Sequence, residues 1–434
     1  MVLLLLAATA CVPTPDAPPA VPGERPGITI ESEVRLGDRL LQLVVDSPSV
    51  GRTAMRVLLP GDFASEPDRR WPVLYLLHGG GGSFVDWTRS SEVEELTEDL
   101  DLVVVMPDGG VGATYVDWIH SGPESQPQWE TYHVEELPAL VARRFRSNGR
   151  AVLAGLSAGG FGAVSYAARH PDRYDAVASF SGNLDTRDDD QVGPVLSAIV
   201  TFALERTFPL GDPFTEEVRW RGHNPLDLAP NLAGVDVFVS GGNGQYGALD
   251  PPLTLPDWLT LESSTERRSR RFVERMGALG LPVTTDFYGN GTHSYRYWSR
   301  ELGRALPLLV GAVERPRPVP SSFTHRSTER RFSVWGWTFE VEGRSAAAFT
   351  DVAVDGGTLS ATGNGTLVVT TPPSFTPGTR YEVGADEVRV GADGRLTFRM
   401  RLGHSAERYT AGPDLPGPRP TGAPARVAIS RVDD

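Results

Sequence analysis

Apolar runs that end in glycine are the feature that most restricts how this chain can fold. The stretches "WPVLYLLHGG", "LDLVVVMPDGG", "AVLAGLSAGG" and "VDVFVSGGNG" show no alternation of apolar and polar residues. Continuous apolar strands are buried on both faces, which is typical of a mainly parallel sheet. Because helix-like segments lie between them, residues 28–315 are predicted to form an α/β domain with a doubly wound sheet.

The segments between these runs complete the predicted domain. Residues 28–59 alternate apolar and polar side chains between turn residues, so they predict an antiparallel entry to the sheet. Residues 184–231 interrupt the alternation of strand and helix, and we interpret them as an inserted, partly helical cap. Helices are expected at 90–100, 129–145, 160–174 and 265–280.

A different pattern follows the proline-rich joint at 313–322. Short stretches of alternating polarity at 330–343, 365–371, 381–391 and 394–403 predict a small all-β module over 322–434, folded as a sandwich. The aromatic residues of "VWGWTF" fit either stacking on a sugar or the core of that sandwich.

Charge and composition exclude some partners. The chain has a formal net charge of −14, and every basic residue is arginine. Because no basic run is present, nothing in the sequence provides the electrostatic footprint of a nucleic-acid-binding protein. Hydrophobic residues make up 40% and charged residues 22%, which is the composition of a globular protein.

The N-terminal residues resemble an export signal. The apolar run "MVLLLLAATA" is too short to span a bilayer but has the length of a signal-peptide core. With Cys11, the one cysteine of the chain, "AATAC" resembles the lipobox of bacterial lipoproteins, in which the cysteine is lipidated. Residues 12–27 are proline-rich and predict an extended tether. We therefore expect a secreted protein anchored to the membrane by lipid, with residues 1–11 as signal and lipobox.

The glycines around Ser157 predict a nucleophile. "GLSAG" fits the G-x-S-x-G elbow, and a strand and a helix flank it as the elbow requires. A sharp reversal between strand and helix holds the serine in a strained conformation and needs neighbours without a β-carbon. The N–H of Ala158 then points to a developing oxyanion, and a second donor is expected from the loop after "VLYLLHGGGG". His78 in that loop is interpreted as scaffolding.

A serine nucleophile needs a histidine base and an acid, which follow it in the order Ser, acid, His. The chain has eight histidines, and His293 is the one that lies in a loop between a strand and a helix well after Ser157. His223 falls in the predicted cap, and two later histidines fall in the β module. The sequence spacing does not choose among the candidate acids, which are Asp250, Asp257, Glu262 and Glu266.

Four stretches read together carry a family resemblance. They are "VVVMPDGG…TYVDW", "QWETYHVEELP", "GLSAGGFGA…AARHPDRYDAVASFSG" and "GNGTHSYRYW". With them, residues 28–312 resemble the esterase D family of α/β-hydrolases, and within it the secreted mycolyltransferases. The resemblance implies the α/β-hydrolase fold and the following site: Ser157 as nucleophile, His293 as base, Glu262 as acid with Asp250 as the alternative, and the N–H groups of Gly80 and Ala158 as oxyanion donors.

These observations predict a secreted serine ester hydrolase or acyltransferase that works through an acyl-serine intermediate, without a metal or cofactor. Its substrate would be an acyl ester, such as a glycolipid or another lipid. The alternative hypothesis is a catalytically degenerate hydrolase fold that serves as a cell-surface binding protein, with the β module as its adhesive part.

Overall fold

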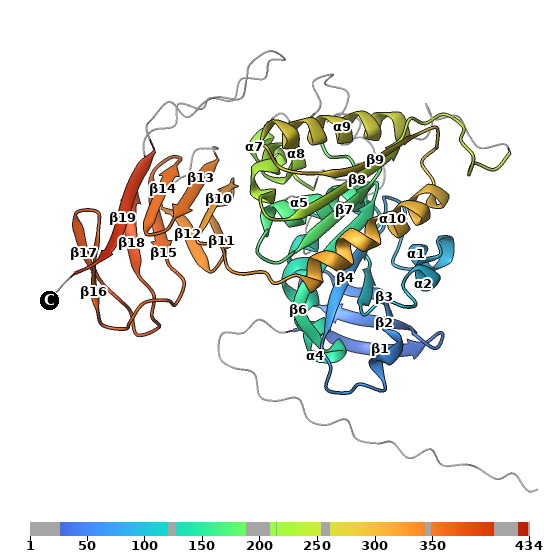
Figure 1. Ribbon diagram of the computed structural model, residues 1–434, viewed down its shortest axis with the longest axis horizontal. Helices are drawn as coiled ribbons and strands as arrows, with labels where there is room; N and C mark the ends of the chain where they lie inside the picture. The colour runs from blue at the N-terminus through green and yellow to red at the C-terminus, as the bar shows by residue number, and fades with distance from the viewer. Residues whose placement is uncertain are drawn as a thin grey trace, which may run out of the picture.

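The computed structural model describes residues 27–119, 127–187, 209–213, 215–252, 261–342, 349–402 and 424–432. They form a larger α/β part and a smaller all-β part, drawn at the right and left of Figure 1. Cys11, the predicted signal and nearly all of the proline-rich segment lie outside these residues. Within the described ranges, none of the helices has the length and apolar character needed to cross a membrane.

The larger part is built on a nine-stranded sheet with the order β1-β2-β3-β5-β4-β6-β7-β8-β9. The first three strands are antiparallel, as predicted, and β3 also runs antiparallel to β5. From β5 onward all neighbours are parallel. The strands are β1 (Thr29–Arg35), β2 (Leu40–Ser47), β3 (Gly51–Leu58), β4 (Trp71–Leu77), β5 (Val103–Pro107), β6 (Ser147–Leu156), β7 (Ala176–Phe180), β8 (Asp236–Gly242) and β9 (Thr284–Gly289).

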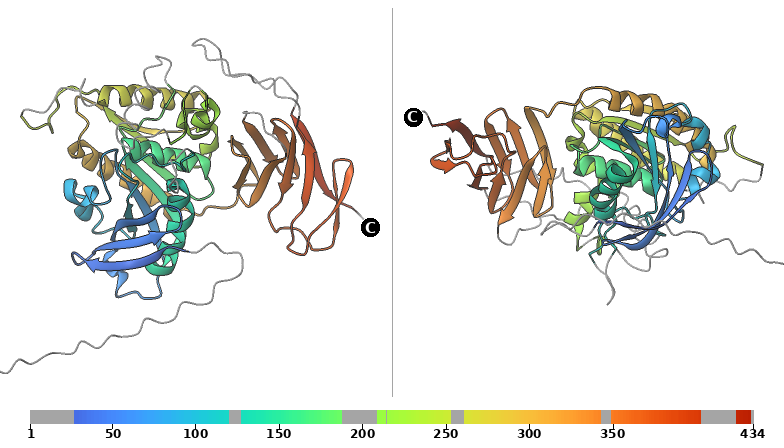
Figure 2. Two further views of the ribbon diagram at one scale, coloured as in Figure 1. Left: turned by 180° about the vertical axis from the view of Figure 1, so that it is seen from behind. Right: turned by 90° about the horizontal axis from the view of Figure 1, so that it is seen from below.

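Helices cover both faces of this sheet, so the predicted doubly wound arrangement is confirmed (Figure 2). On one face, α4 (Leu137–Phe145), α5 (Ala158–Arg169) and α9 (Glu262–Ala278) bury their apolar side chains. On the other, α10 (Tyr295–Glu314) packs together with two short helices. Alternate residues of β4 enter the two cores, which explains its continuous apolar sequence.

Two predicted helices differ from the structure. Residues 90–100 form only a single turn, α2 (Val93–Leu96), which follows α1 (Asp86–Ser90). Val93, Leu96 and Leu100 pack on the same core, but the helix ends at Thr97, whose buried hydroxyl donates to the Val93 carbonyl at 2.7 Å. Such a bond from a side chain to the backbone competes with continuation of the helix. Residues 129–145 are helical but begin with α3 (Trp129–Thr131) and a π-helical turn, η2 (Tyr132–Glu136), before α4.

The described residues of the predicted cap segment, 184–231, contain α7 (Glu217–His223), α8 (Pro225–Leu228) and most of a 3-10 turn, η3 (Ala229–Leu232). Leu228 and Leu232 join the core beside α5. Leu210 and Trp220 of the same segment form a separate buried cluster with Val116.

The C-terminal part consists of two antiparallel sheets around a common core, so the predicted all-β module is confirmed. Val334 and Phe339 of "VWGWTF" are fully buried, and the two tryptophans pack against the same core. These aromatic residues therefore belong to the core. One sheet contains β10 (Ser322–Ser327), β13 (Thr350–Asp355), β14 (Thr358–Thr362), β19 (Ala425–Arg431), β16 (Arg380–Val383) and β17 (Asp386–Arg389), and the other contains β11 (Arg331–Val334), β12 (Trp337–Glu342), β15 (Thr366–Thr370) and β18 (Thr397–Arg401).

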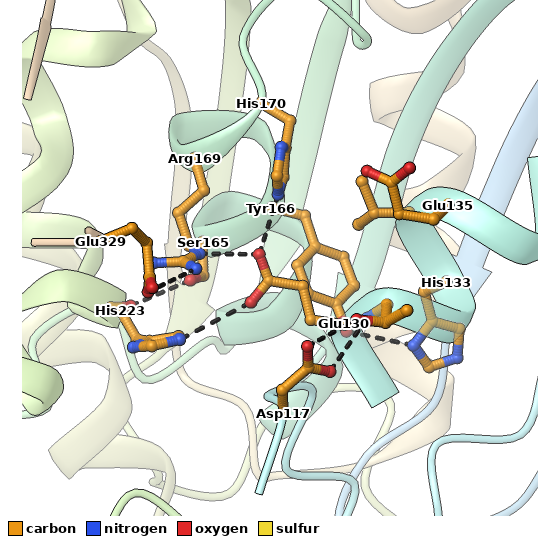
Figure 3. Close-up of polar contacts among 12 residues, drawn as sticks. Asp117, Glu130, His133, Glu135, Ser165, Tyr166, Arg169, His170, His223 and Glu329 are labelled. Atoms are coloured by element: carbon orange, nitrogen blue, oxygen red, sulfur yellow. Dashed lines mark hydrogen bonds and ion pairs between the residues drawn. The ribbon is translucent and has the colours of Figure 1, made fainter. Parts of the chain in front are cut away.

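The two parts meet at the C-terminal end of α5. Figure 3 shows Arg169, the last residue of α5, between Glu130 of the α/β part and Glu329 of the β module, at 2.7 and 3.1 Å. Glu130 also contacts His170 at 2.8 Å. Nearby, the Asn231 amide donates to the carbonyl of Arg326 on β10 and accepts from its N–H, at 2.9 and 2.8 Å. Partly buried polar contacts thus join the module to the sheet domain.

Candidate active site

Ser157 lies at the turn between β6 and α5, with φ 53° and ψ −119°. This conformation is rare for residues other than glycine and is held by the surrounding structure. A Cβ atom on Gly155 would lie 2.2 Å from the carbonyl oxygen of Gly159, and one on Gly159 would lie 2.4 Å from that of His78. Both glycines are therefore required by the close approach of strand, turn and helix, as the sequence pattern predicts.

His293 lies in the loop between β9 and α10 and is bonded to Glu262. Its Nδ1 lies 2.5 Å from Oε2 of Glu262, whose side chain is fully buried. The Trp298 indole and the imidazole pack in a T-shaped arrangement, with 4.7 Å between ring centroids. Glu262 is the first residue of α9, three residues before the predicted start of this helix, and follows Leu261 in the left-handed conformation. The helix start thus presents Glu262 to the loop of His293.

The second oxygen of Glu262 is also satisfied. Oε1 accepts hydrogen bonds from the Ser181 hydroxyl at 2.8 Å and from the Gly242 N–H at 2.7 Å. The Tyr288 hydroxyl donates to it from 3.3 Å, and the Trp298 indole N–H donates to Ser181 from 2.9 Å. With both oxygens bonded, the carboxyl group of Glu262 is held in a fixed orientation.

Sequence reasoning did not identify Ser181 or Tyr288. Both lie at the carboxyl ends of strands, Ser181 directly after β7 and Tyr288 within β9. Burial, followed by the negative charge of Glu262, raises the pKa of Tyr288, so the phenol keeps the proton that it donates. A signal was available, because polar residues that end neighbouring parallel strands meet at one edge of a sheet.

The other candidate acids lie in different surroundings. Asp250 accepts hydrogen bonds from the Gly247 N–H at 2.8 Å, from the Tyr297 hydroxyl at 3.0 Å and from the Thr292 hydroxyl. It thereby ties its own loop to the residue that precedes His293. Of the remaining two acids, Glu266 pairs with Arg270 on α9, and Asp257 lies outside the described residues.

The predicted oxyanion donors are the backbone N–H groups of Gly80 and Ala158. Both line a cavity of about 300 Å³ together with Ser157 and His293. Ala158 is the first residue of α5, where backbone N–H groups have no partner within the helix. Among the described residues, neither the Gly80 N–H nor the Ala158 N–H donates to another group. Both donors are therefore free to bind an anionic oxygen at the cavity.

His78 supports the glycine loop. Its Nδ1 contacts the Gly79 carbonyl at 2.8 Å, and its Nε2 accepts the Gly109 N–H at 2.9 Å. The Tyr115 hydroxyl donates to its carbonyl oxygen at 2.7 Å. His78 thus links the loops that follow β4 and β5, in agreement with its interpretation as scaffolding.

Ser157 and His293 face two cavities. We call the one of about 300 Å³ the larger site cavity and a second one, of about 220 Å³, the smaller site cavity. The larger cavity has a mainly apolar wall, whereas the smaller one is formed by the glycine loop with Asp86 and Tyr295. No group of three or more potential metal-ligating side chains occurs within the described parts of the chain.

Comparisons with known proteins agree with this architecture. A family model described as putative esterase matches residues 48–309. The diacylglycerol acyltransferase/mycolyltransferase Ag85B of Mycolicibacterium smegmatis is 31% identical over 304 residues, covering 66% of this chain and 86% of the relative. Esterase Rv1288 of Mycobacterium tuberculosis is also 31% identical, over 61% of this chain, but this match spans only 56% of that relative.

Solved structures show the same fold. The crystal structure of MPT51 (FbpC1) of Mycobacterium tuberculosis superposes with a TM-score of 0.52 at 26% identity, covering 62% of this chain and 97% of the neighbour. An S-formylglutathione hydrolase from Agrobacterium tumefaciens gives a TM-score of 0.51 at 20% identity, with 65% and 99% covered. At that identity the second likeness concerns the fold alone.

Proposed function

Because the chain belongs to the putative esterase family, whose model matches more than half of it, we propose that it is a secreted serine esterase or acyltransferase with the triad Ser157, His293 and Glu262. The observation that carries the proposal is the contact of 2.5 Å between His293 and the buried Glu262, at a cavity that His293 and Ser157 line together. An acid, an imidazole and a hydroxyl in this order are the parts that acyl transfer requires.

The proposed reaction has two steps. In the first, the Ser157 Oγ attacks the ester carbonyl carbon while Nε2 of His293 takes the hydroxyl proton. The tetrahedral intermediate collapses, the C–O bond to the alcohol breaks, and the imidazolium returns the proton to the departing alkoxide. In the second, water or another alcohol attacks the acyl-serine with His293 as base, which releases the acid or a new ester together with free Ser157.

Glu262 and the backbone donors support both steps. The carboxylate orients the imidazole through Nδ1 and stabilises the imidazolium that forms. The Gly80 and Ala158 N–H groups are proposed to bind the oxyanion, and removing one such donor in other enzymes costs about 3 kcal/mol. Every residue except proline supplies the same N–H at position 158. Ala158→Pro removes this donor at the first position of α5, where a helix tolerates proline, and so tests it directly.

The two site cavities suggest where the acyl and alcohol parts of the substrate bind. We assign the acyl group to the larger site cavity, since its wall is apolar, and the alcohol to the smaller one, where Asp86 and Tyr295 offer polar atoms. The acyl ester substrate, in this proposal a lipid or glycolipid, would thus lie across Ser157. Whether water or a sugar hydroxyl accepts the acyl group is decided by which of them occupies the smaller site cavity.

The test is hydrolysis of a p-nitrophenyl ester, followed by mass analysis of the intact protein. Wild type should hydrolyse the ester and carry the acyl mass on Ser157 during turnover, and Ser157→Ala should do neither. Equal, slow hydrolysis by both proteins would contradict the proposed enzymatic function and favour the binding-protein hypothesis. Adding a sugar acceptor then separates transfer from hydrolysis by the appearance of an acylated sugar.

Export and anchoring are a separate part of the proposal. We propose that residues 1–11 form a signal with a lipobox, that Cys11 is lipidated, and that residues 12–27 tether the enzyme to the membrane, because the only cysteine lies where a lipobox needs it. Cys11→Ser should release the protein from the membrane fraction. A variant that remains in that fraction after a salt wash would contradict lipid anchoring.

A further inference from the structure

Two tyrosine rings stack next to Glu262. Tyr288 of β9 and Tyr297 of α10 have ring planes 1° apart, with 5.2 Å between their centroids. We call these two rings the tyrosine pair. One member, Tyr288, donates its hydroxyl to Oε1 of Glu262 at 3.3 Å. The surroundings of the buried acid therefore include whatever holds this pair in place.

The guanidinium of Arg300 lies over both rings of the tyrosine pair. Its central carbon is 4.5 Å from the ring centroid of Tyr288 and 5.2 Å from that of Tyr297. Both distances are below the limit of about 6 Å within which an aromatic face attracts a cation. Arg300 is itself held, because its Nε donates at 2.8 Å to Glu301, whose side chain is fully buried. The cation thus has a fixed place over the pair.

Tyr297 is the firmly anchored member of the pair. Its side chain is 1% exposed, and its hydroxyl donates to Asp250 at 3.0 Å and accepts the Leu249 N–H at 3.2 Å. The backbone also approaches both rings closely: a Cβ atom on Gly291 would lie 2.5 Å from the ring of Tyr288 and 2.8 Å from that of Tyr297. In such close packing neither ring can shift without moving the backbone.

A continuous line of contacts therefore leads from α10 to the imidazole. Arg300 contacts Tyr288, Tyr288 donates to Glu262, and Glu262 bonds to His293. A positive charge over the face of a phenol attracts the electrons of the ring, which makes the hydroxyl a stronger donor. We infer that Arg300 is a positioning residue for the proposed acyl transfer and acts on Glu262 through the hydroxyl of Tyr288. This inference rests on the proposed serine mechanism and goes beyond it, since Arg300 lines neither site cavity.

The experiment is a double-mutant cycle with p-nitrophenyl butanoate. Tyr288→Phe removes the hydroxyl and keeps the ring, so kcat should fall about three- to tenfold. Arg300→Gln removes the charge and keeps a donor for Glu301, and it should lower kcat about three- to fivefold. The double variant should lose no more than Tyr288→Phe alone, because no hydroxyl is left for Arg300 to act on. KM should stay within about twofold in all three.

The pH profile separates positioning from a loss of folded protein. In both single variants the midpoint of the acidic limb of kcat/KM should move to higher pH, because a carboxylate with a weaker donor attracts the proton of the imidazolium more strongly. A smaller folded fraction would lower the plateau and leave the midpoint in place. Losses that multiply in the double variant, or a midpoint that does not move, would overturn the inference.

Arg270→Gln is the matched control. Arg270 lies over Phe287, the neighbour of Tyr288 in β9, at 4.1 Å and pairs with Glu266. Its replacement should leave both kcat and the midpoint unchanged, although it removes a guanidinium from a ring on the same strand. Arg300→Met, which also removes the charge, gives a second measurement should Arg300→Gln not fold.

Ser157→Ala separates this inference from the proposed function. If wild-type hydrolysis does not depend on Ser157, the mechanism itself is wrong. If hydrolysis depends on Ser157 but the folded Arg300 variants match wild type in kcat and in the midpoint, the mechanism stands and the positioning role of Arg300 is wrong.

Discussion

His293 and Glu262 are joined by a contact of 2.5 Å between Nδ1 and Oε2, and Glu262 is completely buried while making it. A buried carboxylate is costly unless every oxygen is satisfied, and here both oxygens are. Because Glu262 bonds to Nδ1, the pair leaves Nε2 as the imidazole nitrogen that does not contact the acid.

The first prediction compares the two acids. Glu262→Gln keeps the shape of the side chain but removes the negative charge next to the imidazole, so kcat should fall by on the order of a thousandfold or more. Asp250→Asn should lower kcat less than about tenfold, because Asp250 bonds to the loop and not to the imidazole. Steady-state kinetics on a p-nitrophenyl ester measures both, and equal losses would place the acid elsewhere.

Ser181 is predicted to position the acid. Ser181→Ala removes the donor to Oε1 of Glu262 and leaves the Trp298 indole N–H without its acceptor, which should lower kcat about tenfold. Since the effect acts through Glu262, the pH profile of kcat should shift while KM stays within about twofold. A loss that appears only in KM would contradict a positioning role.

The elbow glycines give a prediction for stability. Gly159→Ala would bring a Cβ atom 2.4 Å from the His78 carbonyl oxygen, so the free energy of unfolding should fall by about 1–3 kcal/mol. Gly277→Ala is the matched control, because a Cβ atom there meets nothing within 4 Å in helix α9. This control should stabilise the protein by about 0.5–1 kcal/mol. Urea unfolding measures both differences.

Arg169 is predicted to hold the two parts together. Arg169→Leu leaves the buried Glu130 carboxylate without its arginine and breaks the link to Glu329, which should cost about 3–5 kcal/mol of stability. Arg52→Leu, which removes an exposed ion pair with Glu31, should change the melting temperature little. Equal melting temperatures for the two variants would show that the contacts of Arg169 do not stabilise the junction.

The burial of His325 predicts that the stability of the protein depends on pH. Burial, followed by the positive charges of His170 and Arg169, lowers the pKa of His325 from 6.5 to about 3, so the folded module holds this imidazole neutral. The unfolded chain binds the proton below pH 6.5, and stability should therefore fall as the pH drops from 6.5 towards 3. In His325→Phe this contribution is absent, so its melting temperature should decline less steeply over the same interval.

The apolar runs predicted β4, β5, β6 and β8 because strands buried on both faces leave a continuous pattern. The strands β10, β13, β14 and β19 were not predicted. Their outward residues are polar and their inward ones are few, as in "TLSAT" of β14, so no short window shows a strong signal. Such strands form because they pair with one another within a single sheet, in the order β10-β13-β14-β19.

Some residues of the site could likewise be predicted from the sequence, and others could not. The turn around Ser157 could be predicted from the sequence because this turn requires glycines at fixed positions. The loop of His293 could be predicted because the histidine follows the serine and the acid in chain order. The sequence spacing did not distinguish Glu262 from Asp250 as the acid, because the answer depends on which residue the tertiary structure brings to the imidazole. Ser181 and Tyr288 acquire their roles only when β7, β8 and β9 lie side by side.

Helix α5 follows Ser157 and ends at Arg169, where three acceptors meet the guanidinium. Glu130 and the Gly222 carbonyl belong to the sheet domain, and Glu329 belongs to the C-terminal module. A chain that stops before Ser322 would keep the first two acceptors and lose the third. An engineered sheet domain without the module therefore needs a substitute for Glu329 at this helix end.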